Sequence, residues 1–170
     1  MSNGFVCSIC GQHHEGHTTD WAYKLPDEVW AIPEQERAEQ ARFNDDLCQW
    51  GERYFIRCLL AVPFAEMDGE FGWGAWAEVE WPTFERYLEL YDTDGNAEPI
   101  KLGKLANDLR PYADSLGTDI HIQFRDSTKR PSLFLLPEDG CLLGAEQRNG
   151  IDNARFHDIL RLLQGTAALE

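Results

Sequence analysis

The sequence predicts an α+β domain with a mainly antiparallel sheet, helices packed on that sheet, and an N-terminal zinc knuckle. Two apolar segments, residues 54–62 and 71–81, are separated by Pro63 and by a turn signal at Asp68-Gly69, which is typical of a β-hairpin. Strand and helix patterns then follow in blocks and not as regular βαβ units. This order favours an antiparallel sheet over the alternative, a doubly wound parallel sheet.

The two strands of this hairpin differ in pattern. The first carries one charge, Arg57, so we expect it to be a central strand buried on both faces. The second alternates, which places Trp73 on the core face and Trp76 on a partly wet face, beside Gly72 and Gly74. Exposed aromatic side chains often mark interfaces, so Trp73 and Trp76 are candidate interaction residues. Gly72 and Gly74 would leave a shallow groove on the wet face, or simply accommodate packing.

The remaining elements follow from apolar periodicity. Helical spacing predicts helices near residues 33–43, 84–91 and 102–109 and a last helix from residue 152, and alternation predicts strands at 118–125 and 133–136. A chain of 170 residues with 43% hydrophobic content is sufficient for one core. We expect a single domain over residues 1–168, with the zinc-knuckle segment at 5–48 and a tag remnant at 169–170.

The charge of the chain restricts its partners. Thirty acidic and fifteen basic residues give a formal net charge of −15, which repels nucleic acid backbones and anionic lipid. No apolar stretch approaches the roughly 18 residues of a membrane span, and the N-terminus lacks the layout of a secretion signal. We therefore expect a cytoplasmic protein without nucleic acid or membrane partners. The acidity either serves solubility or docks a protein partner with a basic surface.

A metal site is the most specific signal in the sequence. Cys7 and Cys10 are separated by two residues, and Gly11 lets the backbone turn close around one ion. The candidates for two further ligands are His13, His14, His17 and Cys48. We favour a Zn²⁺ site of Cys7, Cys10, His14 and Cys48, in preference to a redox dithiol or two free thiols.

The fourth ligand separates two classes of function. A closed site of three sulfurs and one nitrogen leaves no position for water, so its zinc would be structural. Without Cys48 the site would be open, and a metal-dependent hydrolase with Glu15 or Asp20 as base becomes the alternative. The motifs of common enzyme classes are absent from the sequence. We therefore expect a zinc-stapled module that binds a protein, as an adaptor or an antidote, and not an enzyme.

One further motif lies before the last helix. Glu146, Gln147 and Arg148 fall on a predicted loop, where functional residues are common. The guanidinium of Arg148 would clamp a carboxylate of a partner, or it would tie the loop to an acidic residue of the same chain. These three residues complete the candidate interaction set.

Four motifs in this order resemble one known family. They are Cys7-x-x-Cys10-Gly11-x-x-His14-x-Gly16, Asp46-Leu47-Cys48, Phe71-Gly72-Trp73-Gly74-x-Trp76 and Glu146-Gln147-Arg148-x-Gly150-Ile151. Over residues 5–163 the chain resembles the uncharacterised bacterial domain-of-unknown-function family 2199. The resemblance implies a histidine ligand at His14 and a cysteine ligand at Cys48, and it implies no activity. Cys58 and Gln49-Trp50 depart from the family pattern without touching these ligands.

Overall fold

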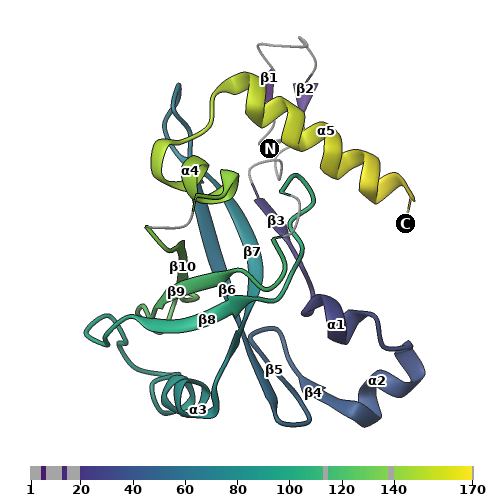
Figure 1. The fold of residues 1–170 in the computed structure, drawn as a ribbon, viewed down its shortest axis with the longest axis vertical. Coiled ribbons are helices and arrows are strands. Elements are labelled where there is room, and N and C mark those ends of the chain that lie inside the picture. Colours follow the sequence, from purple (N-terminus) through teal and green to yellow (C-terminus); the bar gives the residue numbers. More distant parts are fainter. Residues whose placement is uncertain (1–4, 7–12, 15–19, 113–114, 138–139, 170) are drawn as a thin grey trace.

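A computed structural model describes residues 5–6, 13–14, 20–112, 115–137 and 140–169 of the chain. They form an α+β fold (Figure 1). The helices are α1 (Asp27–Trp30), α2 (Glu34–Gln40), α3 (Trp81–Glu89), α4 (Leu142–Asn149) and α5 (Asn153–Leu169). The strands are β1 (Phe5–Val6), β2 (His13–His14), β3 (Asp20–Ala22), β4 (Ala41–Phe43), β5 (Leu47–Trp50), β6 (Arg53–Pro63), β7 (Glu70–Val79), β8 (Lys101–Leu105), β9 (Asp119–Gln123) and β10 (Ser132–Leu135).

Strands β6 to β10 form a closed barrel. Each consecutive pair in this run is antiparallel, and Figure 1 shows β8 and β9 crossing the long strands β6 and β7. Five strands that alternate in direction bring the last one parallel to the first, so β10 pairs with β6 in parallel. This closing ladder has one pair of Cα partners, Ser132 and Leu59. The predicted hairpin therefore forms two of the five barrel strands.

Three shorter strands extend the sheet beyond the barrel. On one side β3 pairs with β7 in parallel, and on the other β5 and β4 continue antiparallel from β6. The prediction of a mainly antiparallel sheet with helices packed on it needs two corrections, because the sheet closes on itself and because β3–β7 and β10–β6 are parallel. The alternation of apolar and polar residues along a strand shows which face of the strand is buried. It does not show whether the sheet closes into a barrel.

Trp73 and Trp76 belong to two different cores. Trp73 lies with the barrel core and Trp76 lies on the opposite face of β7, as the alternation predicts, but both are fully buried. A second apolar cluster covers Trp76, formed by Leu25, Val29, Ile32, Ala41, Cys48, Phe55 and Ala106. The indole Nε1 of Trp76 also donates to the carbonyl oxygen of Tyr23, at 3.0 Å. The predicted wet face around Trp76 is wrong, and neither tryptophan is available as an interaction residue.

The predicted helix near residues 102–109 is also wrong, because residues 101–105 form strand β8. Gly103 lies between β7 and β9, where an added Cβ would come within 2.8 Å of the carbonyl oxygen of Glu78 and of Ile122 Cδ1. Leu102 is 69% exposed on the outside of the barrel, which a core-facing helical leucine would not be. The helical spacing of these leucines is thus coincidental, and tertiary pairing decides the conformation.

The seam between β6 and β10 is sealed by a side chain of helix α4. The amide Nε2 of Gln147 donates to the carbonyl oxygens of Leu133, at 2.8 Å, and Ala61, at 3.4 Å. Its Oε1 accepts a hydrogen bond from the backbone N–H of Leu135, at 2.9 Å. The amide of Gln147 thereby bonds to backbone groups of β6 and β10 that do not pair with each other.

We predict that Gln147→Leu destabilises the fold by about 2–4 kcal/mol, because it leaves the backbone groups of both seam strands without partners. The control is Arg148→Ala, since Arg148 is exposed and its loss should cost less than about 0.5 kcal/mol. Urea unfolding followed by circular dichroism measures both values. Equal stability of the two variants would contradict the role given to Gln147.

Candidate functional site

The loop between β9 and β10 carries three cations. Within it, the carboxylate of Asp126 accepts from Thr128 N, at 2.9 Å, and from the Thr128 hydroxyl, and these hydrogen bonds lower the pKa of Asp126. This Asx turn presents Arg125, Lys129 and Arg130. Leu59 N donates to Pro131 O, at 2.8 Å, and so fixes the end of the loop on β6. Closure of the barrel therefore places the loop cations beside the outer face of β6.

A pocket of about 380 Å³ lies between this loop, β3, β6 and β7, and we name it the basic pocket. Its lining residues are Asp20, Trp21, Ala22, Arg57, Cys58, Leu59, Gly72, Gly74, Arg125, Lys129 and Arg130. The described lining thus has four cations and one carboxylate, in a chain whose net charge is −15. The rest of the lining is largely apolar. Such a pocket concentrates positive potential at one spot of an otherwise negative molecule.

Arg57 is the unusual member of this lining. It extends from the central strand β6, its Nη1 donates to the carbonyl oxygen of Asp45 at 3.3 Å, and its Nε is buried without an acceptor. Burial, followed by the nearby charge of Arg130, lowers the pKa of Arg57. A buried donor of a charged group without a partner costs free energy. This Nε–H has almost no accessible surface, so an anionic ligand would supply the missing acceptor only after the guanidinium turns toward the pocket.

Arg130 is already engaged at the rim. Its Nε lies 3.1 Å from Oδ1 of Asp46, and the hydroxyl of Tyr91 donates to Oδ2 of the same carboxylate at 2.6 Å. The hydrogen bond to Asp46 raises the pKa of Tyr91. Asp46 therefore occupies the position that a ligand's anionic group would compete for.

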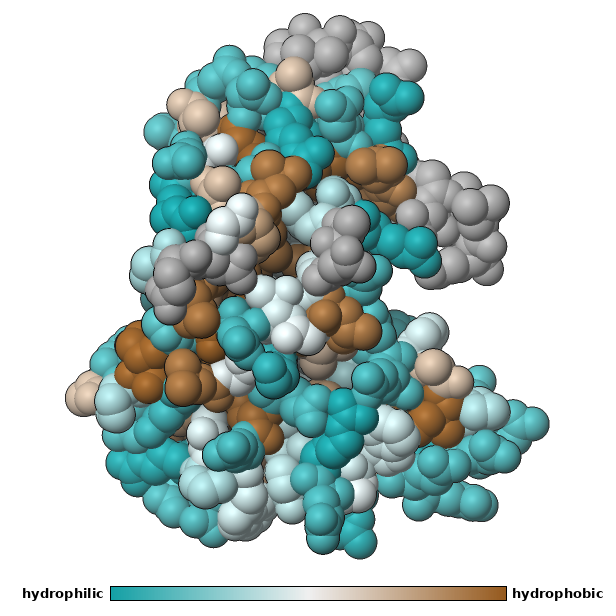
Figure 2. Space-filling model, in the orientation of Figure 1, coloured by the Kyte–Doolittle hydropathy of each residue, from teal (hydrophilic) through white to brown (hydrophobic). Residues whose placement is uncertain are grey.

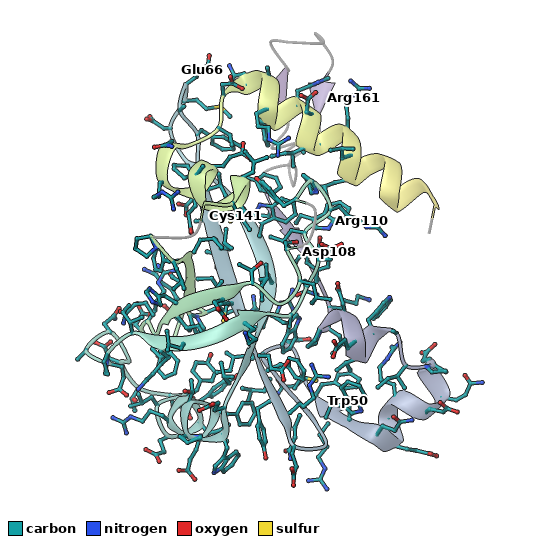
Figure 3. All side chains as sticks on the ribbon, viewed as in Figure 1. Trp50, Glu66, Asp108, Arg110, Cys141 and Arg161 are labelled. Atoms are coloured by element: carbon teal, nitrogen blue, oxygen red, sulfur yellow. The ribbon has the colours of Figure 1, made fainter. Side chains whose placement is uncertain are left out.

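A second pocket, of about 650 Å³, lies between β3, α1, the β8–β9 connection and α5, and includes Trp30 and Leu163. Figure 2 shows the molecular outline notched between α1 and α5, and Figure 3 shows Asp108 and Arg110 beside this region. Its two carboxylates serve the fold, because Asp27 accepts from Asn107 Nδ2 and from Asp108 N, and Asp108 accepts from Ser115 Oγ. The basic pocket has a side-chain donor without an acceptor, the Nε–H of Arg57, and is therefore the stronger candidate.

Of the four proposed zinc ligands, the structure describes the side chain of Cys48 alone. Cys7 and Cys10 lie outside the described residues, in the connection between β1 and β2, and of His14 the backbone alone is described. Cys48 is buried among apolar side chains on β5, and Figure 1 shows β5 and β2 at opposite ends of the molecule. Within the described ranges, no three His, Cys, Asp or Glu side chains form a metal-binding group. The N-terminal zinc knuckle and Cys48 as its ligand thus gain no support from the fold.

Glu146 and Gln147 serve the fold, and of the predicted motif Arg148 alone is exposed. The carboxylate of Glu146 accepts from Arg155 Nε, at 2.9 Å, which joins α4 to α5, and Gln147 seals the barrel seam. The motif lies on helix α4 and not on a loop. The residues that sequence reasoning missed are the four cations of the basic pocket. Arg57, the single charge in the apolar segment 54–62, was the available signal.

The chain matches the model of a protein family over residues 6–151, and that family is described as an uncharacterised protein conserved in bacteria, DUF2199. The chain belongs to this family. The matched range includes every residue of the basic pocket and of the barrel seam. No curated protein and no solved structure matches the chain. Among the described residues, no helix has both the length and the apolar character to cross a membrane.

We predict that Cys48 and Cys58 resist iodoacetamide at pH 8 in the folded protein, because both thiols are buried. Burial raises the pKa of Cys48 to about 12 and raises that of Cys58 further, so neither forms the reactive thiolate at this pH. Mass spectrometry after labelling, with and without urea, measures the modification. Labelling of Cys48 at the unfolded rate without denaturant would contradict its placement in the second core.

Proposed function

We propose that this chain is a ligand-binding domain that holds a small organic anion in the basic pocket. The observation that carries the proposal is Arg57, a charged side chain that lines the pocket while its Nε–H lacks an acceptor. Arg125 and Lys129 add positive charge from the loop, and Ala22 and Leu59 add apolar surface. Ligand sites in proteins combine such apolar walls with a few converging polar groups.

The size of the pocket indicates the class of ligand. A volume of about 380 Å³ fits a metabolite-sized molecule and is too small for a folded partner. The guanidinium groups of Arg57, Arg125 and Arg130 favour carboxylate or phosphate, because their planar donor pairs match these oxygen atoms. No nucleophile with an adjacent base was found in the described part of the lining, so binding is proposed and no reaction.

The test is titration calorimetry with benzoate and phenyl phosphate as probes. Arg57→Gln should weaken binding of whichever probe binds by about tenfold or more, because a hydrogen bond to a charged group contributes about 1.5–3 kcal/mol. Lys104→Gln is the matched control, since it removes one positive charge at an exposed position on β8, outside the pocket lining. If neither probe binds, or if both variants weaken binding equally, the proposal fails.

We further propose that zinc, if it is bound, takes its ligands from Cys7, Cys10 and a nearby histidine such as His14. The antiparallel pairing of β1 and β2 supports this, because it brings His14 opposite Phe5, and Cys7 and Cys10 lie between these two strands in the sequence. Cys48 is omitted from this set because its neighbours are apolar. Any stabilising effect of the metal would be confined to the N-terminal segment.

Elemental analysis of purified variants tests the metal proposal. Cys7→Ser should lose zinc, because a thiolate ligand is removed, whereas Cys48→Ala should retain the stoichiometry of the unmodified protein. Loss of zinc from Cys48→Ala with the fold intact by circular dichroism would instead support the four-ligand site predicted from the sequence. Absence of zinc from the unmodified protein would contradict the proposed zinc site.

The adaptor or antidote role and the hydrolase alternative stay predictions. The net charge of −15 supports docking to a basic protein surface, and the described residues add no specific surface to that argument. For the hydrolase, Asp20 lies on the lining of the basic pocket among cations, and Glu15 lies outside the described residues. The described residues around Asp20 form no metal-binding group.

A further inference from the structure

We infer that the ligand of the basic pocket is an acidic amino acid, an anion that also carries an ammonium group; the inference rests on the proposed function. The carboxylates would lie at Arg125 and Lys129, and the ammonium group would lie at Asp20. Asp20 and Arg125 line the same pocket with opposite charges. In the described part of the chain, neither of these two side chains forms an ion pair or a hydrogen bond.

The carboxylate of Asp20 lies against the sheet at the side of the pocket that β3 forms. The pairing of β3 with β7 puts Asp20 opposite Gly72. A Cβ at Gly72 would lie 2.7 Å from Oδ1 of Asp20 and 3.0 Å from Cδ1 of Leu59, so the carboxylate fills the space that this glycine leaves. Asp20 is exposed, so a ligand can reach its carboxylate. The pocket therefore has an anionic side, which a positively charged group would complement.

The loop between β9 and β10 forms the cationic side of the pocket. Arg125 is half-buried and has no ion pair with a described residue, and Lys129 has one long ion pair, of 3.9 Å, with a carboxylate of its own loop. Arg57 and Arg130 are less available, because both lie beside the acidic pair Asp45-Asp46. Arg125 and Lys129 are therefore the cations to which we assign the carboxylates of the ligand.

Strands β7 and β6 separate the two sides of the pocket. One row of paired residues crosses the sheet from β3 to β10, in the order Ala22, Gly74, Leu59 and Ser132. Neighbouring strands are about 4.8 Å apart, so β3 and β10 are three such spacings apart. The long side chains of the loop cations extend over part of this distance, and the short side chain of Asp20 extends over less. The remaining gap suits a ligand of a few carbon atoms with charges at both ends.

The charges of the lining indicate the charges of the ligand. Four cations and one carboxylate leave an excess of positive charge in the described lining. Two carboxylates and one ammonium group give a ligand with a single net negative charge, and this ligand offers a partner to both sides of the pocket. A plain dicarboxylate would leave Asp20 without a partner and would be repelled by it. A plain amine would leave the cations without a partner.

The first experiment compares L-glutamate, glutarate and γ-aminobutyrate by titration calorimetry at pH 7.5. Glutarate lacks the ammonium group of L-glutamate, and γ-aminobutyrate lacks one of its carboxylates. L-Glutamate should bind about threefold or more tightly than either, because each analogue loses one ion pair with an accessible side chain. Equal or tighter binding of glutarate would overturn the ammonium assignment, and equal binding of γ-aminobutyrate would overturn the second carboxylate. If benzoate or phenyl phosphate binds and L-glutamate does not, this inference fails alone; if none of these probes binds, the proposed function fails with it.

Arg125→Gln tests the cationic side of the pocket. It should weaken both L-glutamate and glutarate by about threefold or more, since both probes place a carboxylate at Arg125. The fold should remain intact by circular dichroism, because Arg125 makes no side-chain bond to another described residue. Unchanged binding of both probes would overturn the place assigned to the carboxylates.

Asp20→Asn is the decisive variant, because its effect on the two probes should have opposite signs. It should weaken L-glutamate about threefold, since the ammonium group loses its partner, and it should strengthen glutarate, since a repelling charge is removed. Damage to the fold would weaken both probes, and a site for anions alone would bind both more tightly. Asp119→Asn is the control, since it removes an exposed carboxylate outside the pocket lining and should change neither affinity. Changes of the same sign for both probes, or no change for L-glutamate, would overturn the role of Asp20.

Discussion

The parallel closure of β10 onto β6 is the constraint on which the rest of the structure depends. Five strands alternating in direction leave this last pair parallel, with one pair of Cα partners, and Gln147 of α4 supplies the remaining hydrogen bonds across the seam. Closure completes the interior in which Trp73 is buried. It also leaves the outer face of β6 and β7 for a second core around Trp76 and for a pocket farther along the same strands.

The same closure assembles the basic pocket from distant parts of the sequence. Arg57 comes from the first barrel strand, and the loop cations come from the connection that leads into the last one. The bond from Leu59 N to Pro131 O joins the two at the seam. Strand pairing fixes the backbone of Arg57, and the bond to Pro131 fixes the end of the loop beside it. The buried Nε of Arg57 then marks where that arrangement lacks an acceptor.

The sequence predicted the elements better than their assembly. Alternation located β7 and placed Trp76 on the face opposite Trp73, because side-chain direction is a local property. What covers that face depends on α1 and β5, which lie far away in the chain, so its exposure was predicted wrongly. The sequence also did not indicate that the four cations line one pocket, because their proximity results from barrel closure. The zinc prediction rested on a local motif, Cys7-x-x-Cys10, and on Cys48, a distant residue that the fold places in an apolar core.

Arginine side-chain Nε–Hε signals in ¹H–¹⁵N NMR spectra test the central claim most directly, because Arg57 Nε–H is the donor to which the account assigns the ligand. On titration with phenyl phosphate, the Arg57 signal should shift together with the backbone amides of Leu59 and Gly74. Assignment by comparison with Arg57→Lys identifies the signal. Shifts confined to the second pocket, at Trp30 and Arg110, with an unchanged Arg57 signal, would contradict the account.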